Sequence, residues 1–152
     1  VLSRLNPTDP MLVSAADNIF RFPIADIWQQ FLIDQRHRVI ALPETDPAKL
    51  HRTGVLALGD EDRVLRLHEK PTTPPSTWSC PPLYFLQPSA IQHLAALRAA
   101  GSSLDAPGHF IDFLCRREAV VAQKVDGSRL DIGDLQGYQL ADQILRRDPV
   151  LI

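Results

Sequence analysis

Short apolar runs alternate along the chain with longer segments whose apolar residues recur every three or four positions. The apolar runs cover residues 11–16, 38–42, 54–58, 63–69, 83–86, 119–125 and 129–132. Pro, Gly and charged residues bound these runs, as is typical of β-strands. The helical periodicity covers residues 23–36, 88–101, 108–118 and 135–145. This alternation predicts an α/β fold in which a mixed sheet is flanked by helices.

Local signals indicate where several of these elements begin and end. The first apolar run fits a buried strand that ends at Asp17. The segments GVLAL and RVLRLHE flank the turn GDED and predict a β-hairpin. Pro88 and Gly101 bracket one predicted helix, and Asp134 stands where the N-cap of the last helix is expected.

Composition narrows the class of protein. The 152 residues, 45% of them hydrophobic, suit one compact domain with a core. A net charge of −2 without a basic stripe argues against a nucleic-acid partner, and no apolar run approaches the ~20 residues of a membrane span. No signal peptide is visible. Cys80 and Cys115 lack metal-ligand spacing and are expected to be reduced thiols of a cytoplasmic protein.

Two acids, Asp17 and Asp131, stand at the ends of predicted strands. Open α/β sheets bind ligands outside the carboxyl ends of their strands, so the two carboxylates could meet there. Such a pair would suit Mg²⁺, which takes few carboxylates and completes its shell with water and phosphate oxygens. Asp is also a common turn residue, and the spacing alone favours that simpler interpretation for each.

A second candidate is the pair Glu69–Lys70, which follows an apolar strand and precedes Pro71. It can be interpreted as a solvated strand end with two opposite charges. It can also be interpreted as a phosphate-binding Lys beside a Glu that accepts hydrogen bonds from hydroxyls. The five histidines do not form a set with metal-ligand spacing, and Tyr84 is expected in the core with the other aromatic residues.

The order of the motifs resembles the sugar-1-phosphate nucleotidyltransferase family. LVSAADNIF is similar to its strand that ends in Gly-Asp-Asn, and GVLALGDEDRVLRLHEKPTTPPST is similar to its hairpin with a Glu-Lys-Pro motif. PPLYFLQPSAI resembles its Gly-Ile-Tyr strand and the helix after it. LDAPGHFIDFLCRRE and RLDIGDLQGYQLA resemble a Pro-Gly-x-Phe-Ile helix and an Asp-Ile-Gly strand end. The resemblance covers residues 11–145 and implies a Rossmann-like α/β/α sandwich.

The resemblance also implies an activity and a set of site residues. Asp17 and Asp131 match the aspartates that hold the catalytic Mg²⁺, Glu69 matches the acid that contacts sugar hydroxyls, and Lys70 matches the lysine beside the sugar phosphate. Tyr84 is counted with Glu69 and Lys70 as substrate-binding. The implied partners are a nucleoside triphosphate and a sugar 1-phosphate, which react to a nucleotide sugar and pyrophosphate. Alignment and charge neutralisation would carry this reaction.

Some features of the family have no counterpart in this sequence. Nothing matches its Gly-rich nucleotide-binding loop. Residues 1–152 are therefore interpreted as a single partial domain that lacks the N-terminal nucleotide-binding portion, and this part is expected to be inactive alone. Ala16 replaces a Gly, and Pro82 stands where a Gly precedes Ile-Tyr. Two alternatives therefore stay open: a non-catalytic sugar-phosphate-binding or regulatory remnant, and an unrelated α/β domain. An exposed sheet edge could drive self-pairing into a homo-oligomer.

Overall fold

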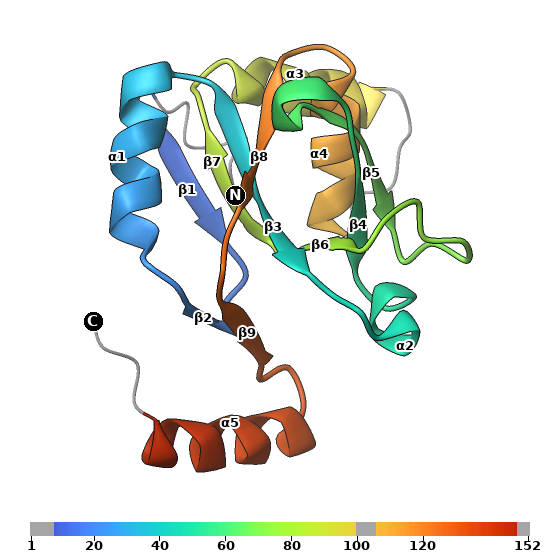
Figure 1. The fold of residues 1–152 in the computed structure, drawn as a ribbon. Helices are drawn as coiled ribbons and strands as arrows, with labels where there is room; N and C mark the ends of the chain where they lie inside the picture. Colours follow the sequence, from blue (N-terminus) through green and yellow to red (C-terminus); the bar gives the residue numbers. More distant parts are fainter. Residues whose placement is uncertain (1–7, 100–105, 149–152) are drawn as a thin grey trace.

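The computed structural model describes residues 8–99 and 106–148 and shows a mixed sheet with helices on both faces (Figure 1). In spatial order the main sheet contains β1 (Met11–Ser14), β7 (Leu83–Leu86), β3 (His37–Pro43), β6 (Trp78–Cys80), β4 (Gly54–Leu58) and β5 (Val64–Glu69). A seventh strand, β8 (Val120–Lys124), pairs with β3 in parallel, whereas the other pairs of this sheet are antiparallel. The predicted fold class is therefore confirmed.

The helices are α1 (Ile24–Asp34), α2 (Pro47–Leu50), α3 (Ala90–Ala99), α4 (Pro107–Cys115) and α5 (Leu135–Arg147), with a short 3₁₀ turn, η2 (Asp60–Asp62). Figure 1 shows α1 on one face of the sheet and α3 with α4 on the other. None of the helices in the described ranges is long and apolar enough to cross a membrane.

Strand β3 forms the middle of the core because both of its faces are covered. Val39 and Ala41 pack into the cluster that holds α3 and α4, whereas Ile40 and Leu42 pack with α1. Successive side chains of a strand point to opposite faces, so an uninterrupted apolar run is what a strand between two helical layers requires. Phe31 on α1 is fully buried and anchors that helix to the sheet.

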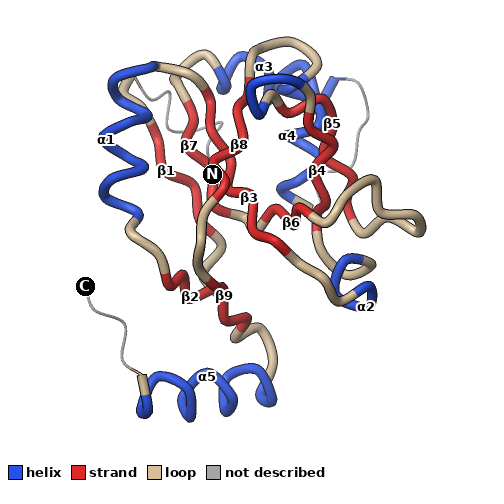
Figure 2. Tube along the Cα trace, in the orientation of Figure 1, coloured by secondary structure: helices blue, strands red, loops and turns tan. Residues whose placement is uncertain are grey.

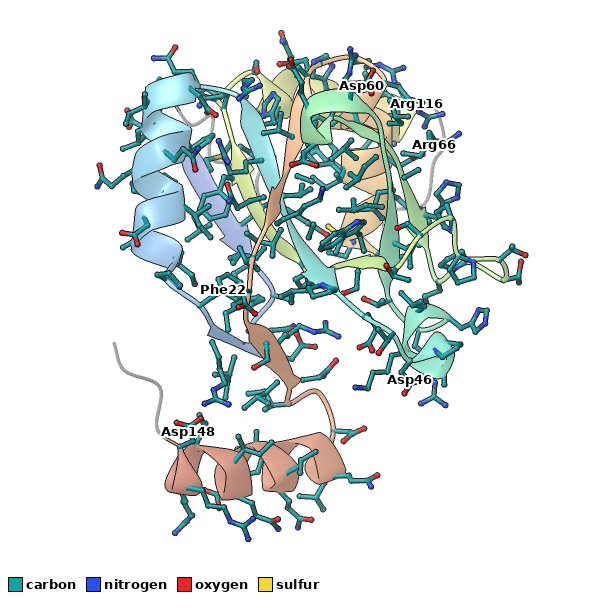
Figure 3. The ribbon with its side chains drawn as sticks, in the orientation of Figure 1. Phe22, Asp46, Asp60, Arg66, Arg116 and Asp148 are labelled. Carbon is teal, nitrogen blue, oxygen red and sulfur yellow. The ribbon has the colours of Figure 1, made fainter. Side chains whose placement is uncertain are left out.

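Two short strands form a ribbon of their own beneath the main sheet (Figure 2). These are β2 (Asn18–Arg21) and β9 (Ser128–Asp131), which pair in antiparallel fashion. Helix α5 follows β9 directly and lies against the ribbon (Figure 1). At the far end of α5, Asp148 accepts a hydrogen bond from Arg21 of β2 (Figure 3). The ribbon thus joins the beginning and the end of the described chain.

The structure corrects several boundaries predicted from the sequence. The first strand ends at Ser14 and not at Asp17, because the chain turns at residues 16–17 before β2 begins. This strand is half-exposed, not buried, because it lies at the edge of the sheet. Strands β2 and β6 and helix α2 were not predicted. Gly101, the predicted end of α3, lies outside the described residues.

Candidate functional site

The β2–β9 ribbon brings the two predicted metal-binding aspartates together. Asp17 immediately precedes β2, Asp131 ends β9, and the ribbon register pairs Asn18 with Asp131. The backbone also joins the two positions, because the carbonyl of Asp17 accepts the Ile132 N–H at 2.8 Å. Two acids far apart in the sequence therefore stand at adjacent positions of one antiparallel pair.

Their carboxylates converge beside Gly133. A Cβ built on this glycine would stand 3.2 Å from Oδ1 of Asp131 and 3.2 Å from Oδ2 of Asp17, so the two oxygens are at most twice that distance apart. The Gly133 N–H donates to Oδ1 of Asp131 at 3.1 Å. The two carboxylates therefore lie on the same side of the ribbon, near each other, and the expectation that they share one cation stays a prediction. Asp134 is the N-cap of α5, as predicted, and accepts the Gly137 N–H at 2.7 Å.

The pair is compatible with a hard cation that needs few protein ligands. Both aspartates are exposed, with 60% of the Asp131 side chain accessible. Among the described residues, no three His, Cys, Asp or Glu side chains are grouped so that they could hold a metal ion. Two carboxylates are sufficient for Mg²⁺ only when water and phosphate oxygens complete the octahedron. The donor set therefore fits Mg²⁺ shared with a phosphorylated substrate.

Glu69 ends β5 and points toward the N-terminus of α4. Its carboxylate lies so close to Gly108, in the first turn of that helix, that a Cβ there would collide with Oε2. A helix N-terminus favours negative charge, which helps to hold an acid at this depth. Glu69 also lines a cavity of about 370 Å³ with His68, His109 and residues 71–73 among its neighbours.

Lys70 follows Glu69 and has an exposed side chain and a left-handed backbone with φ of 47°. Its N–H donates to the carbonyl of Thr53 at 3.1 Å, which fixes the turn after β5. A lysine in this region of φ/ψ space costs free energy, and such residues cluster at functional sites. Lys70 does not line the cavity that contains Glu69.

Tyr84 is on β7 and is 3% exposed, in the core cluster beneath α3 and α4. Burial raises the pKa of Tyr84 well above its usual value, and the charges of Cys80 and Glu69 raise it further. Its position in the core agrees with the expectation drawn from its residue type. Tyr84 is not among the residues that line the Glu69 cavity, so its substrate contact stays a prediction.

A buried thiol, Cys80, has a pKa that is affected by charges from both ends of the candidate site. Burial and the charge of Glu69 raise the pKa of Cys80, while the charge of Arg129 lowers it. Both charges therefore act on the same thiol from nearby. Cys80 and Cys115 are unpaired and buried, and burial with the charge of Asp112 raises the pKa of Cys115 to about 11. Neither thiol has the lowered pKa that a nucleophile needs.

Comparison with known proteins assigns the chain to a family. The family model described as nucleotidyl transferase matches residues 2–147. The chain belongs to the nucleotidyl transferase family. The resemblance inferred from the ordered motifs, to sugar-1-phosphate nucleotidyltransferases, is thereby confirmed.

Solved structures of nucleotidyl transferases share the fold. A Bacillus anthracis protein described as a glucose-1-phosphate thymidylyltransferase, in complex with sucrose, superposes with a TM-score of 0.80 at 19% identity, over 95% of this chain and 57% of that one. A UDP-glucose pyrophosphorylase complexed with UDP-glucose gives 0.78 at 18% identity, over 95% and 59%. A UDP-glucose pyrophosphorylase from Acinetobacter baumanii gives 0.73 at 16%, over 97% and 55%. This nucleotidyl transferase chain thus spans little more than half the length of the structures it matches.

Sequence reasoning missed two polar side chains beside the aspartates. Asn18 donates to Oδ1 of Asp17 at 2.6 Å, and Arg129 donates to Oδ1 of Asn18 at 3.0 Å. A second guanidinium nitrogen of Arg129 lies 3.7 Å from Oδ2 of Asp131. Period-2 alternation could have placed Arg129 on the face of Asp131, but only the register shows that Asn18 lies opposite.

Sequence reasoning also missed a histidine cluster away from the aspartates. Nε2 of His37 and Nε2 of His93 lie 2.8 and 2.5 Å from the two carboxylate oxygens of Glu118, and Ser89 donates to Oε2 at 2.9 Å. The expectation from the sequence concerns metal-ligand spacing, and it does not foresee that these two histidines share a hydrogen-bond partner. They share one acid as a hydrogen-bond partner and join β3 to α3.

Proposed function

We propose that this chain carries the sugar-phosphate- and cation-binding part of an enzyme that transfers a nucleotidyl group from a nucleoside triphosphate to a sugar 1-phosphate. The convergence of Asp17 and Asp131 beside Gly133 carries the proposal. Membership of the nucleotidyl transferase family supports the reaction class. In this reaction a phosphate oxygen of the sugar bonds to the α-phosphorus, and the bond to the departing pyrophosphate breaks.

The proposed roles follow from the chemistry of each side chain. Asp17 and Asp131 would hold Mg²⁺, which when bound supplies positive charge to the phosphate oxygens. Lys70 would place an ammonium against the sugar phosphate, because its side chain is exposed. Glu69 would accept hydrogen bonds from sugar hydroxyls, with Tyr84 as a further substrate-binding residue. Alignment and charge neutralisation are the main contributions that these groups can make.

The chain alone is expected to bind a sugar 1-phosphate but not to make a nucleotide sugar. The triphosphate must be held in line with the attacking phosphate, commonly by backbone N–H groups of a Gly-rich loop. The printed sequence contains no such loop. Loss of alignment could forfeit much of the roughly 7–11 kcal/mol that positioning can supply.

Calorimetric titration with several hexose 1-phosphates in the presence of Mg²⁺ tests the binding. Lys70→Ala and Asp131→Asn should each weaken binding by about 10–100-fold, the equivalent of losing a charge-assisted hydrogen bond. Lys49→Ala should bind as the wild type does, because Lys49 is an exposed lysine of α2 beside Glu44. Equal binding by all four proteins would make Lys70 an ordinary surface charge and end the proposal.

A pyrophosphate-release assay with several nucleoside triphosphates and hexose 1-phosphates tests the second half of the expectation. We expect no turnover by the wild-type chain. Robust turnover that disappears in Asp131→Ala would show that residues 1–152 hold a complete active site. If the chain binds a sugar 1-phosphate but shows no turnover even when a nucleotide-binding protein portion is added, the non-catalytic alternative is favoured.

A further inference from the structure

We propose that Asn18 and Arg129 are positioning residues and that they make the site selective for a small octahedral cation. They turn one oxygen of each aspartate toward the Gly133 point, the position beside Gly133 that lies 3.2 Å from both oxygens. The inference rests on the proposed cation site at Asp17 and Asp131. It gives a role to two residues, Asn18 and Arg129, that the resemblance left without one. It also gives a physical reason why the site would prefer one cation over another.

The hydrogen bonds form a bridge from one carboxylate toward the other. Arg129 carries only donors, so the amide oxygen of Asn18 must face it, and the amide nitrogen must then face Asp17. The distances agree with this assignment: 3.0 Å from Arg129 Nη1 to Asn18 Oδ1, and 2.6 Å from Asn18 Nδ2 to Asp17 Oδ1. Nη2 of Arg129 lies 3.7 Å from Oδ2 of Asp131.

The bridge contacts one oxygen of each carboxylate and leaves the other beside Gly133, where Oδ1 of Asp131 also accepts the Gly133 N–H at 3.1 Å. Oδ1 of Asp17 accepts from Asn18, so Oδ2 of Asp17 is the oxygen that reaches the Gly133 point. Oδ2 of Asp131 faces Arg129, so Oδ1 of Asp131 is the oxygen at that point. Each acid thus presents a single oxygen to the shared point, and its other oxygen is directed at the bridge.

The fold holds the bridge in place. Asn18 pairs with Asp131 across the ribbon, and Arg129 precedes Asp131 by two residues on the same strand face. The Arg129 side chain is only 26% exposed, whereas that of Asp131 is 60% exposed. The Arg129 side chain is therefore the less exposed of the two and has less freedom to move.

Cations differ in the number and arrangement of carboxylate oxygens that they bind. Mg²⁺ and ions of similar size require near-octahedral geometry at about 2.0–2.1 Å, which suits one oxygen from each acid. Ca²⁺ accepts bidentate carboxylates in flexible shells of six to eight oxygens. A bridge that hydrogen-bonds Oδ1 of Asp17 and keeps Oδ2 of Asp131 beside a guanidinium disfavours bidentate binding, so it favours the smaller ions.

Separate calorimetric titrations of the whole chain with Mn²⁺ and with Ca²⁺ test this inference. Arg129→Lys keeps the charge but replaces the planar fork, so it cannot hold Asn18 and face Asp131 in the same way. The preference for Mn²⁺ over Ca²⁺ should fall about tenfold or more in Arg129→Lys and in Asn18→Ala, in line with the effect of removing partners of metal ligands. Arg116→Lys is the matched control, because Arg116 pairs with Asp112 within α4, far from the ribbon (Figure 3).

Each result decides the matter. An unchanged Mn²⁺/Ca²⁺ ratio in Arg129→Lys would reduce Arg129 to a simple charge and overturn the inference, while the cation site itself stands. A wild-type chain that binds neither ion would overturn both the cation site and the positioning role. Thermal unfolding of each variant checks that the ribbon is intact, and Arg129→Lys, which keeps the aliphatic stem, is the variant that preserves folding best.

Discussion

Lys70 combines an unfavourable backbone with a side chain that the proposed reaction needs. A left-handed residue other than Gly costs about 1–2 kcal/mol of folding free energy, and Gly avoids that cost. Gly loses about 0.5–1 kcal/mol of this advantage, because it makes the unfolded chain more flexible. Lys70→Gly should therefore be about 0.5–1 kcal/mol more stable than Lys70→Ala in urea denaturation. Both variants should lose sugar-phosphate binding to the same extent.

The comparison of Gly with Ala at this position separates strain from charge. If Lys70→Gly were less stable than Lys70→Ala, the turn after β5 would cost the fold nothing. The same pair of substitutions at Lys49, in the regular backbone of α2, should give the opposite order, because Gly weakens a helix relative to Ala.

Some residues of the candidate site can be predicted from the sequence and others cannot. The pairing of Asp17 with Asp131 is expected from the family resemblance of their motifs, because their places in the sequence alone favour a turn role for each. Asn18 and Arg129 depend on which residues face each other across the β2–β9 ribbon, and the register of two strands 111 positions apart is a tertiary property.

Among the elements, the joint between β3 and α3 depends on one acid. Nδ1 of His37 accepts the Gln87 N–H at 3.1 Å, so the neutral ring carries its proton on Nε2 and donates it to Glu118. Burial acts to raise the pKa of Glu118, but hydrogen bonds from His37, Ser89 and His93 outweigh it and lower the pKa below its usual 4.5.

The lowered pKa of Glu118 predicts an acid-sensitive contribution to stability. A carboxylate with a folded pKa below its unfolded value stabilises the protein fully above the unfolded pKa and loses that effect as the pH falls through the folded pKa. Glu118→Gln should cost about 1–3 kcal/mol at pH 6, because Gln cannot accept from both histidines. The difference from the wild type should shrink below about pH 4.5.

Chemical denaturation of both proteins between pH 3 and pH 6 measures that difference. Glu44→Gln is a matched control, because Glu44 lies 3.7 Å from the exposed Lys49 and accepts the Asp46 N–H at 2.9 Å, which a Gln amide oxygen can also accept. A gap between the wild type and Glu118→Gln that is equal at pH 3 and pH 6 would mean that packing, and not the charge of Glu118, holds the joint.

The elements that sequence patterns missed are the ones shaped by their partners. Strand β2 has Asn18 and Arg21 at its ends and no alternation that signals a strand, and only its pairing with β9 extends it. Strand β6 is three residues long and follows a proline-rich segment. By contrast, the apolar patterns of β3 and α1 are long enough to predict a strand and a helix from the sequence alone, and the structure confirms both.

At the scale of the molecule, the two outer strands of the main sheet are treated differently. At β5, Asp112 of α4 accepts the Leu67 N–H at 3.3 Å and Cys115 donates to the Leu65 carbonyl at 3.4 Å, so a helix covers that edge. At β1, the described residues pair only with β7, and Leu12 is 44% exposed. An uncovered edge strand is a template for pairing with another chain.

Strand β1 should therefore drive self-association of the isolated chain. Leu12→Lys should shift sedimentation at high protein concentration toward the monomer, since a charged edge residue opposes strand pairing. Leu65→Lys, a comparably exposed leucine on the covered β5, should sediment as the wild type does. Identical association of all three proteins would place the contact elsewhere.

The β2–β9 ribbon has a consequence for the chain during its synthesis. Its two strands are made far apart in time: at about 5–20 residues per second, Arg129 leaves the peptidyl transferase centre roughly 6–22 s after Asn18. Throughout that interval the growing polypeptide has the first aspartate without the second. The nascent chain therefore cannot form the carboxylate pair until its last strand has emerged from the ribosome and folded back.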